Sequence, residues 1–179
     1  MTDNGLPAEH PAIEPLSFLL GRWEGAGKGD YPTIEAFDFI QQLTFSHIGK
    51  PYLIYTSRSW RLEKDEDGAP RRGAPLAVEA GFWRPQPDNR VEVLLTHPTG
   101  ITEIYLGEVT GTRIEMATDA VVRTESAKPV TAGKRLYGLV DSVRRPGEKD
   151  LAYAYDMAAM DQPLQPHLWA AHLEWVWTE

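Results

Sequence analysis

Ten short segments with strand character follow one another along this chain, and a turn comes after almost every one. Turn-forming stretches such as "SHIGKP", "HPTG" and "RRPGEKD" separate them, and Gly, Pro, Asn and Asp are the residues that turn geometry favours. Evenly spaced short strands with no long helix between them predict an antiparallel meander. The predicted strands are Arg22–Gly29, Ala36–His47, Tyr52–Glu63, Leu76–Pro85, Arg90–Thr96, Ile101–Thr110, Thr112–Ala120, Val130–Val140, Asp150–Met157 and His167–Thr178.

A sheet of this kind is stable as a sandwich or as a barrel, and closure into a barrel removes the exposed strand edges. We therefore predict an all-β fold, a closed antiparallel up-and-down β-barrel of about ten strands. One short helix over Ala12–Leu20, ended by Gly21, precedes it. We expect residues 1–15 to form a flexible N-terminal tail and residues 16–179 a single barrel domain. A barrel of this size can hold one sizeable ligand.

Composition excludes several classes of function. The chain has no cysteine, which leaves no disulfide, no thiolate metal site and no cysteine nucleophile. Its net charge is −8 and its Lys and Arg residues are scattered, which argues against nucleic acid and against an anionic membrane as partners. The stretch "MTDNGLPAEHPAIEP" has neither a basic start nor an apolar run, so neither a signal peptide nor a membrane span is predicted. A cytoplasmic protein is expected.

The stretch "GRWEGAGKGDYPTI" alternates between two kinds of residue. Gly21, Trp23, Gly25, Gly27 and Gly29 share one face of a strand, while charged residues crowd the other. Glycine is unfavourable inside a strand, so a row of them indicates a sharp bend or the close approach of something flat. The spacing fits neither a dinucleotide fingerprint nor a phosphate-binding loop. Both interpretations stay open on the pattern alone.

These residues resemble a known family. The segment "LLGRWEGAGKGDYPTIEAFDFIQQLTFSHIGKPYLIYTSRSW" is similar to the opening of the nitrobindin family of haem-binding β-barrels, including its GxWxGxG signature at Gly21, Trp23, Gly25 and Gly27. The segment "MAAMDQPLQPHLWAAHLEW" resembles the family's closing segment. The resemblance covers most of residues 16–179 and is strongest at the two ends.

The resemblance implies that His167 is the proximal ligand of haem iron, since it matches the histidine of the family's PLxPHL segment. Strand alternation in "HLWAAHLEWVW" points His172 to the opposite face, together with Leu168 and Ala170. On the residues alone, a core histidine hydrogen-bonded to a backbone carbonyl is favoured over a metal ligand, and the matched motifs reverse this preference. The predicted face of His167 also carries Trp169, Ala171, Leu173, Trp175 and Trp177.

Further haem contacts are carried over from the resemblance or read from strand phase. The resemblance implies Thr33 and Met157 as contacts, and Gly25 and Gly27 would leave room for a flat macrocycle. In "RVEVLLTHPTG", His97 shares a face with apolar residues just before a turn. It either reaches the distal side of the haem or lies in solvent at the rim. Trp23 is expected to close one end of the barrel.

The function that the resemblance implies is that of a peroxynitrite isomerase. One haem b per chain would bind nitric oxide and isomerise peroxynitrite to nitrate at ferric iron, with no catalytic residue beyond the iron itself. We expect these small molecules as partners and a monomer or homodimer. The alternative is a carrier of an apolar small molecule such as a fatty acid, in which Arg135 and Tyr137 would bind the carboxylate. A third possibility is a barrel whose pocket stays empty.

Overall fold

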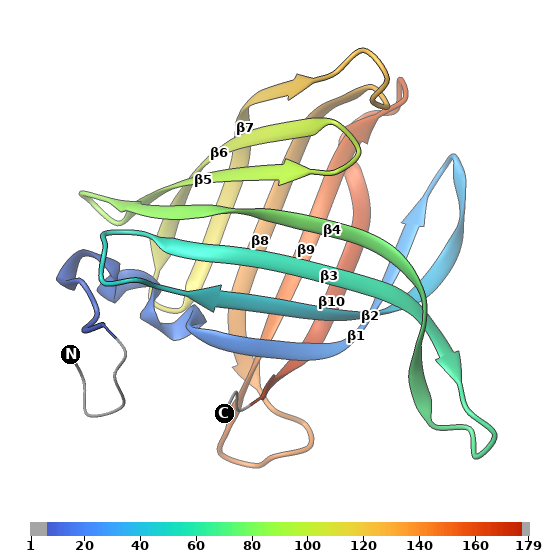
Figure 1. Cartoon of the computed structure of the whole chain (residues 1–179), viewed down its shortest axis with the longest axis horizontal. Coiled ribbons are helices and arrows are strands. Elements are labelled where there is room, and N and C mark those ends of the chain that lie inside the picture. Colours follow the sequence, from blue (N-terminus) through green and yellow to red (C-terminus); the bar gives the residue numbers. More distant parts are fainter. Residues whose placement is uncertain (1–6, 177–179) are drawn as a thin grey trace.

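Ten antiparallel strands close into one barrel in the computed structural model, which describes residues 7–176 (Figure 1). Each strand pairs with its neighbours in sequence, and β1 pairs with β10 to complete the ring. The predicted fold class is thereby confirmed. The strands are β1 Gly21–Tyr31, β2 Ile34–Ser46, β3 Leu53–Lys64, β4 Pro70–Gln86, β5 Arg90–His97, β6 Ile101–Thr110, β7 Arg113–Arg123, β8 Val130–Asp141, β9 Lys149–Ala159 and β10 Gln165–Val176.

A short 3-10 helix, η1 (Pro11–Leu19), lies at one end of the barrel, on the left in Figure 1. Its side chains Ile13, Leu16 and Leu19 are wholly buried, and the indole nitrogen of Trp23 donates to the carbonyl of Leu19 at 2.8 Å. Residues 11–15 were expected in the tail but lie in a helix that packs on the barrel. Residues 1–6 of that tail lie outside the described residues.

The β3–β4 hairpin is longer than predicted. The sequence "KDEDGAPRRGAP" was expected to be one turn, but β3 continues to Lys64 and β4 begins at Pro70. Its polar residues pair across the strands: Glu63 lies opposite Arg71 and forms an ion pair with it. Charged cross-strand pairs stabilise a solvent-exposed hairpin without producing the apolar alternation by which strands are recognised.

The interior divides into three parts along the barrel axis. Next to η1 it is filled by apolar and aromatic side chains, among them Trp83, whose ring packs edge-on against Phe45 (5.4 Å) and Tyr137 (5.1 Å). A smaller apolar cluster that includes Tyr31 and Ile101 lies near the β1–β2 and β5–β6 turns, at the opposite end (Figure 1). Polar and charged side chains occupy the space between, and they frame the site.

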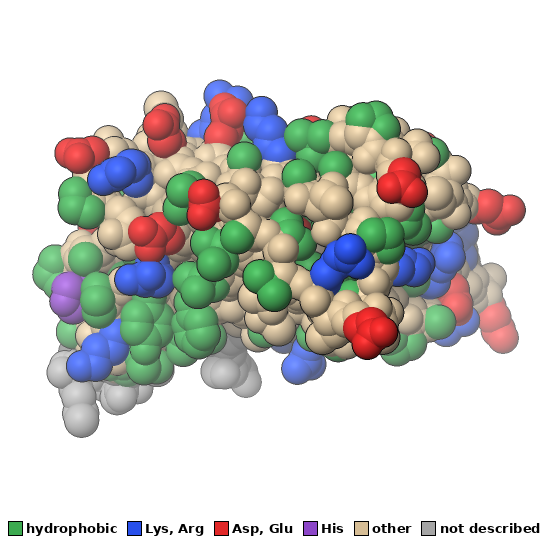
Figure 2. Space-filling model, turned by 90° about the horizontal axis from the view of Figure 1, so that it is seen from above, with side chains coloured by type: hydrophobic (Ala, Val, Ile, Leu, Met, Phe, Trp, Pro, Cys, Tyr) green, Lys and Arg blue, Asp and Glu red, His purple; other side chains and the backbone are tan. Residues whose placement is uncertain are grey.

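The outer surface carries charges of both signs. Lys, Arg, Asp and Glu side chains are interspersed on the face seen in Figure 2, and neither sign forms a continuous patch there. Within residues 7–176, no helix is long and apolar enough to cross a membrane.

Candidate functional site

His167 faces the barrel interior near the end of β1. Its Nδ1 lies 3.1 Å from the backbone oxygen of Asp30, and because a carbonyl only accepts, Nδ1 carries the proton. The ring packs edge-on against Tyr31 (centroids 5.3 Å apart) and Tyr155 (5.8 Å). Burial lowers the pKa of His167 below its usual value, although the Asp30 carbonyl opposes this in part. The imidazole is therefore neutral at neutral pH, with Nε2 as the nitrogen that has a free lone pair.

A bulge in β10 sets this orientation. The register against β9 shifts between Pro166 and Leu168, and Leu168 pairs with the inward-facing Tyr155. A bulge adds one residue to a strand, so two successive side chains can face the same side. His167 and Leu168 both face inward for this reason, which corrects the predicted alternation between them.

A second register shift, between Ala170 and Leu173, restores the original phase. Between the two shifts the predicted face of His167 is wrong: Trp169 points outward and is 38% exposed, while Ala170 is buried. Within the second shift His172 faces outward, as predicted, and its Nδ1 donates to Asp150 at 3.1 Å. The predicted face also included Trp177, which lies outside the described residues.

His97 lies on the wall opposite His167, because β5 and β10 are separated by four strands in either direction around the barrel. Its side chain is 19% exposed, and its Nε2 donates to Glu103 at 2.9 Å. Nδ1 lies 3.7 Å from a carboxylate oxygen of Glu79. His97 also pairs in register with Ile101, a member of the smaller apolar cluster near the β5–β6 turn. It therefore faces the interior rather than the solvent.

Glu79 and Glu103 meet Arg135 inside the barrel. The guanidinium of Arg135 is 3% exposed and donates to both oxygens of Glu79, at 2.8 and 2.9 Å. A longer bond of 3.5 Å reaches Glu103, and Nε donates to the hydroxyl of Tyr105 at 3.1 Å. We call Glu79, Glu103 and Arg135 the charged cluster. A buried guanidinium held by a bidentate carboxylate is a strong, directional pair.

The charged cluster fixes the ionisation of its own members. Burial alone would raise the pKa of Glu79, but the charge and hydrogen bonds of Arg135 lower it to about 2. Burial likewise opposes the ionisation of Glu103, and His97 and Arg135 together hold its pKa below the usual value. Both carboxylates are therefore anions at neutral pH.

Tyr155 connects the charged cluster to His167. One edge of the ring contacts the imidazole, and the guanidinium carbon of Arg135 lies 4.3 Å from the ring centroid. The hydroxyl donates to Glu103 at 3.4 Å. Changes in the charged cluster can therefore reach His167 through a single side chain.

Met157 and Thr33 lie at the same end of the barrel but differ in exposure. Met157 is partly buried and packs against both apolar clusters. Its carbonyl lies 3.2 Å from the hydroxyl of Tyr31, which also accepts from the amide of Ala159 at 2.9 Å. Thr33 is exposed on the β1–β2 turn, with its hydroxyl 3.6 Å from the sulfur of Met160.

The glycine face of β1 is covered by the chain itself. A Cβ on Gly27 would collide with the ring of Phe39, and one on Gly29 with the ring of Phe37. At Gly25 the backbone of β10 approaches closely, where the β1–β10 register shifts. The flat groups that approach Gly27 and Gly29 are thus two phenylalanine rings of the neighbouring strand.

Sequence reasoning missed Glu79 and Glu103. Each shares a strand face with residues that are otherwise apolar or glycine, in "AVEAGFW" and "ITEIYLGEV". A carboxylate on an inward face is expensive unless it is paired, and that signal could have been used. Nothing in the pattern identifies the partner, because Arg135 lies 56 residues from Glu79 in sequence.

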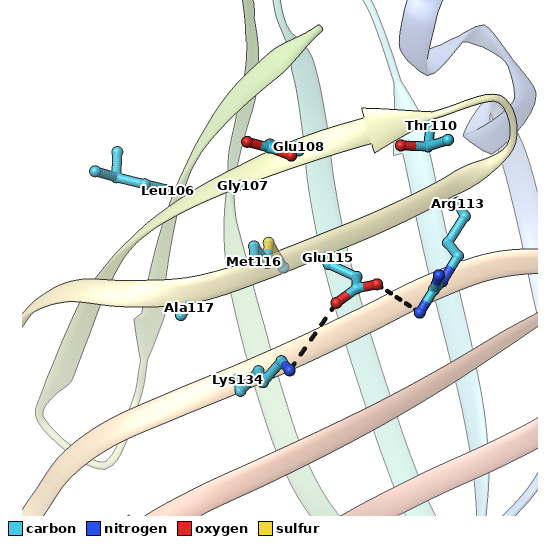
Figure 3. Close-up of a pocket in the computed structure, with 9 residues that line it drawn as sticks. All are labelled: Leu106, Gly107, Glu108, Thr110, Arg113, Glu115, Met116, Ala117 and Lys134. Atoms are coloured by element: carbon cyan, nitrogen blue, oxygen red, sulfur yellow. Dashed lines mark ion pairs between the residues drawn. The ribbon is translucent and has the colours of Figure 1, made fainter.

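Two hollows lie on the surface of the barrel. One of about 390 Å3 lies over β6, β7 and β8, where Glu115 forms ion pairs with Arg113 (2.5 Å) and Lys134 (3.9 Å) (Figure 3). Another of about 300 Å3 lies beside Trp169 and Lys28. Neither is lined by His167 or His97. These two histidines face the interior, and we take the interior between them as the candidate site.

Comparison with known proteins identifies relatives that span nearly the whole chain. A protein of Nocardioides sp. (strain ATCC BAA-499 / JS614) named "Peroxynitrite isomerase" is 56% identical over 161 residues, 90% of this chain and 92% of the relative. A "Ferric nitrobindin-like protein" of Thermobifida fusca (strain YX) is 46% identical, over 89% of this chain and 91% of the relative.

The fold has a solved counterpart. The crystal structure of Rv2717c from M. tuberculosis matches with a TM-score of 0.75 and 39% sequence identity, over 93% of this chain and 99% of that one. The profile of the family described as "THAP4-like, heme-binding beta-barrel domain" matches residues 12–173. The chain therefore belongs to the THAP4-like haem-binding β-barrel family, the nitrobindin family.

Proposed function

We propose that this chain binds one haem b through His167 and, with the iron in the ferric state, isomerises peroxynitrite to nitrate. Nitric oxide is a further ligand of the same iron in this proposal. Membership of a haem-binding family and several relatives named peroxynitrite isomerase support it.

One observation carries the proposal, namely the hydrogen bond from Nδ1 of His167 to the Asp30 carbonyl. It fixes the tautomer so that Nε2 is unprotonated, and burial keeps the ring neutral. No hydrogen bond to Nε2 occurs among residues 7–176. A neutral imidazole oriented through its other nitrogen is the arrangement of a proximal haem ligand. The residues present therefore fit the cofactor.

Ferric haem, when bound, supplies the Lewis acid that assists cleavage of the peroxynitrite O–O bond and its rearrangement to nitrate. The residues of the chain would hold the haem and orient it within the barrel. His167 would bind the iron from the β10 wall, and His97 would face the opposite side from β5. Thr33 and Met157 are our proposed further contacts with the cofactor. The expectation that Gly25 and Gly27 also contact it is wrong, because β10 covers Gly25 and the ring of Phe39 covers Gly27.

Rapid mixing of the haem-loaded protein with peroxynitrite tests this proposal. We expect peroxynitrite to decay faster with increasing protein concentration and nitrate to be the product, with the iron still ferric afterwards. The protein without haem should have no such effect. Decay at the rate of an equal concentration of free haem would contradict the proposal.

The proposal includes a cytoplasmic location and a monomeric or homodimeric state. Cell fractionation tests the first, and light scattering of the haem-loaded protein distinguishes the two oligomeric states.

A further inference from the structure

The charged cluster contains a complete binding site for a carboxylate. Arg135 offers two parallel N–H donors, and the hydroxyl of Tyr55 adds a third donor, which reaches Glu79 Oε1 at 2.6 Å. The hydroxyl of Tyr137 lies 3.4 Å from the same guanidinium. Planar bidentate recognition by arginine, with a tyrosine hydroxyl beside it, is how proteins select carboxylates.

The carboxylate in this site belongs to the chain. Both oxygens of Glu79 accept hydrogen bonds from the guanidinium of Arg135. Glu103 accepts from it only at 3.5 Å, and its other hydrogen bonds are with His97 and Tyr155. Removing Glu79 would thus leave Arg135 buried with one long ionic contact. Such a guanidinium strongly favours any carboxylate that can reach it.

A ligand could reach this position from the mouth of the barrel. The side chains of Glu79 and His97 are 13% and 19% exposed, whereas Arg135 behind them is 3% exposed. The path to the guanidinium therefore passes through the volume that Glu79 occupies. Tyr55 and Tyr137 line the far side and are buried.

We propose that Glu79 is a specificity-determining residue, because its carboxylate occupies the fork of Arg135 and thereby keeps the carboxylate of a fatty acid from binding to this guanidinium. The barrel thus has the carboxylate-binding site of a carrier, but its own Glu79 occupies that site. This inference does not depend on haem, because it concerns contacts within the polypeptide alone.

The test uses the full chain without haem and the variant Glu79→Ala, with acetate as the probe. Melting temperature is measured in acetate and in chloride at matched ionic strength. A ligand that binds only the folded state raises the melting temperature with its concentration. We expect Glu79→Ala to melt at least several degrees below the wild type in chloride and to regain much of the loss in acetate, saturably. The wild type should melt at the same temperature in both salts.

Three variants make the result specific. Glu79→Gln keeps the shape of the side chain, so acetate should have no room and no effect. Glu79→Ala combined with Arg135→Leu should lose the acetate response, since the donor is gone. Glu63→Ala removes an exposed carboxylate that also pairs with an arginine, Arg71, and should show no acetate response.

A fluorescent long-chain fatty acid provides a second readout. We expect Glu79→Ala to bind it at least tenfold more tightly than the wild type does. The proposal is overturned if Glu79→Ala responds equally to acetate and chloride, or stays unfolded at every acetate concentration. Equal fatty-acid affinity in the wild type and the variant would also overturn it.

Discussion

His97 on β5 and His167 on β10 face the barrel interior from opposite walls, with four strands between them in either direction. Each imidazole is oriented differently: His167 donates to a backbone carbonyl, while His97 donates to a buried carboxylate. Burial lowers the pKa of His167, so this ring is neutral and its Nε2 has a free lone pair. The two histidines are thereby suited to different roles, ligation on one wall and a hydrogen bond to a carboxylate on the other.

Replacing His167 by alanine should remove the axial ligand and leave the barrel folded, because the side chain makes ring contacts and a single hydrogen bond. Removing a residue that only hydrogen-bonds to a metal ligand lowers metal affinity roughly 10–100-fold. Removing the ligand His167 itself should lower haem affinity by more. Haem titration followed by visible spectroscopy measures this.

The matched control is His172→Ala on the outer face of the same strand. It loses a contact with Asp150 but keeps Arg145 on that carboxylate, so the haem spectrum should be unchanged. If the two variants exchanged effects, the strand phase described for β10 would be wrong.

His97→Leu should keep haem uptake close to the wild-type level but destabilise the fold. Glu103 is 1% exposed and loses its shortest hydrogen bond in this variant, which leaves the longer bonds from Arg135 and Tyr155. A hydrogen bond to a charged group contributes about 1.5–3 kcal/mol. Chemical denaturation gives the stability and haem titration the affinity. A loss of haem as large as in His167→Ala would instead make His97 a ligand.

Gly27→Val should destabilise the barrel by roughly 1–3 kcal/mol, the usual cost of overpacking a core. The new side chain would meet the ring of Phe39 and, at 2.7 Å, the carbonyl of Trp169. Lys28→Val, on the exposed outer face, should change stability by no more than about 0.5 kcal/mol. Denaturant midpoints compare them, and a stable Gly27→Val would mean that Phe39 moves aside without cost.

Acid should unfold the protein partly through Glu79. Its pKa is about 2 in the folded state and near 4.5 when unfolded, so the folded state is favoured above pH 4.5. That stabilisation is lost as pH falls from about 4.5 towards 2, at roughly 1.4 kcal/mol per pKa unit. Glu79→Gln should flatten the stability curve over this window. An identical slope in both proteins would contradict the assignment.

The fold could be predicted from sequence more fully than the site. Strand alternation and turns gave the ten strands, and β6 has the predicted bounds, because its inward and outward residues alternate without interruption. In β10 two bulges reverse the alternation around Trp169, and a bulge leaves no mark in composition. The charged cluster was not predicted, because its members come from β4, β6 and β8. A strand pattern shows which side chains share a face, but it does not show which side chain lies opposite them across the barrel.

The glycine row illustrates the same limit. Its alternation left two interpretations open, a sharp bend or a flat group close to the backbone of β1, and the resemblance implied haem as that group. The rings of Phe37 and Phe39 take that place in the structure, since each is paired in register with the glycine that it covers. The register between β1 and β2 determines which group covers the glycines, and the sequence does not show that register.

The most direct test of the account is a titration of the full chain with haem, recorded in the visible range. A defined Soret band that saturates at one haem per chain, and that His167→Ala loses, is the predicted result. A broad spectrum of free or aggregated haem at every ratio, or a Soret band that His167→Ala leaves unchanged, would contradict it.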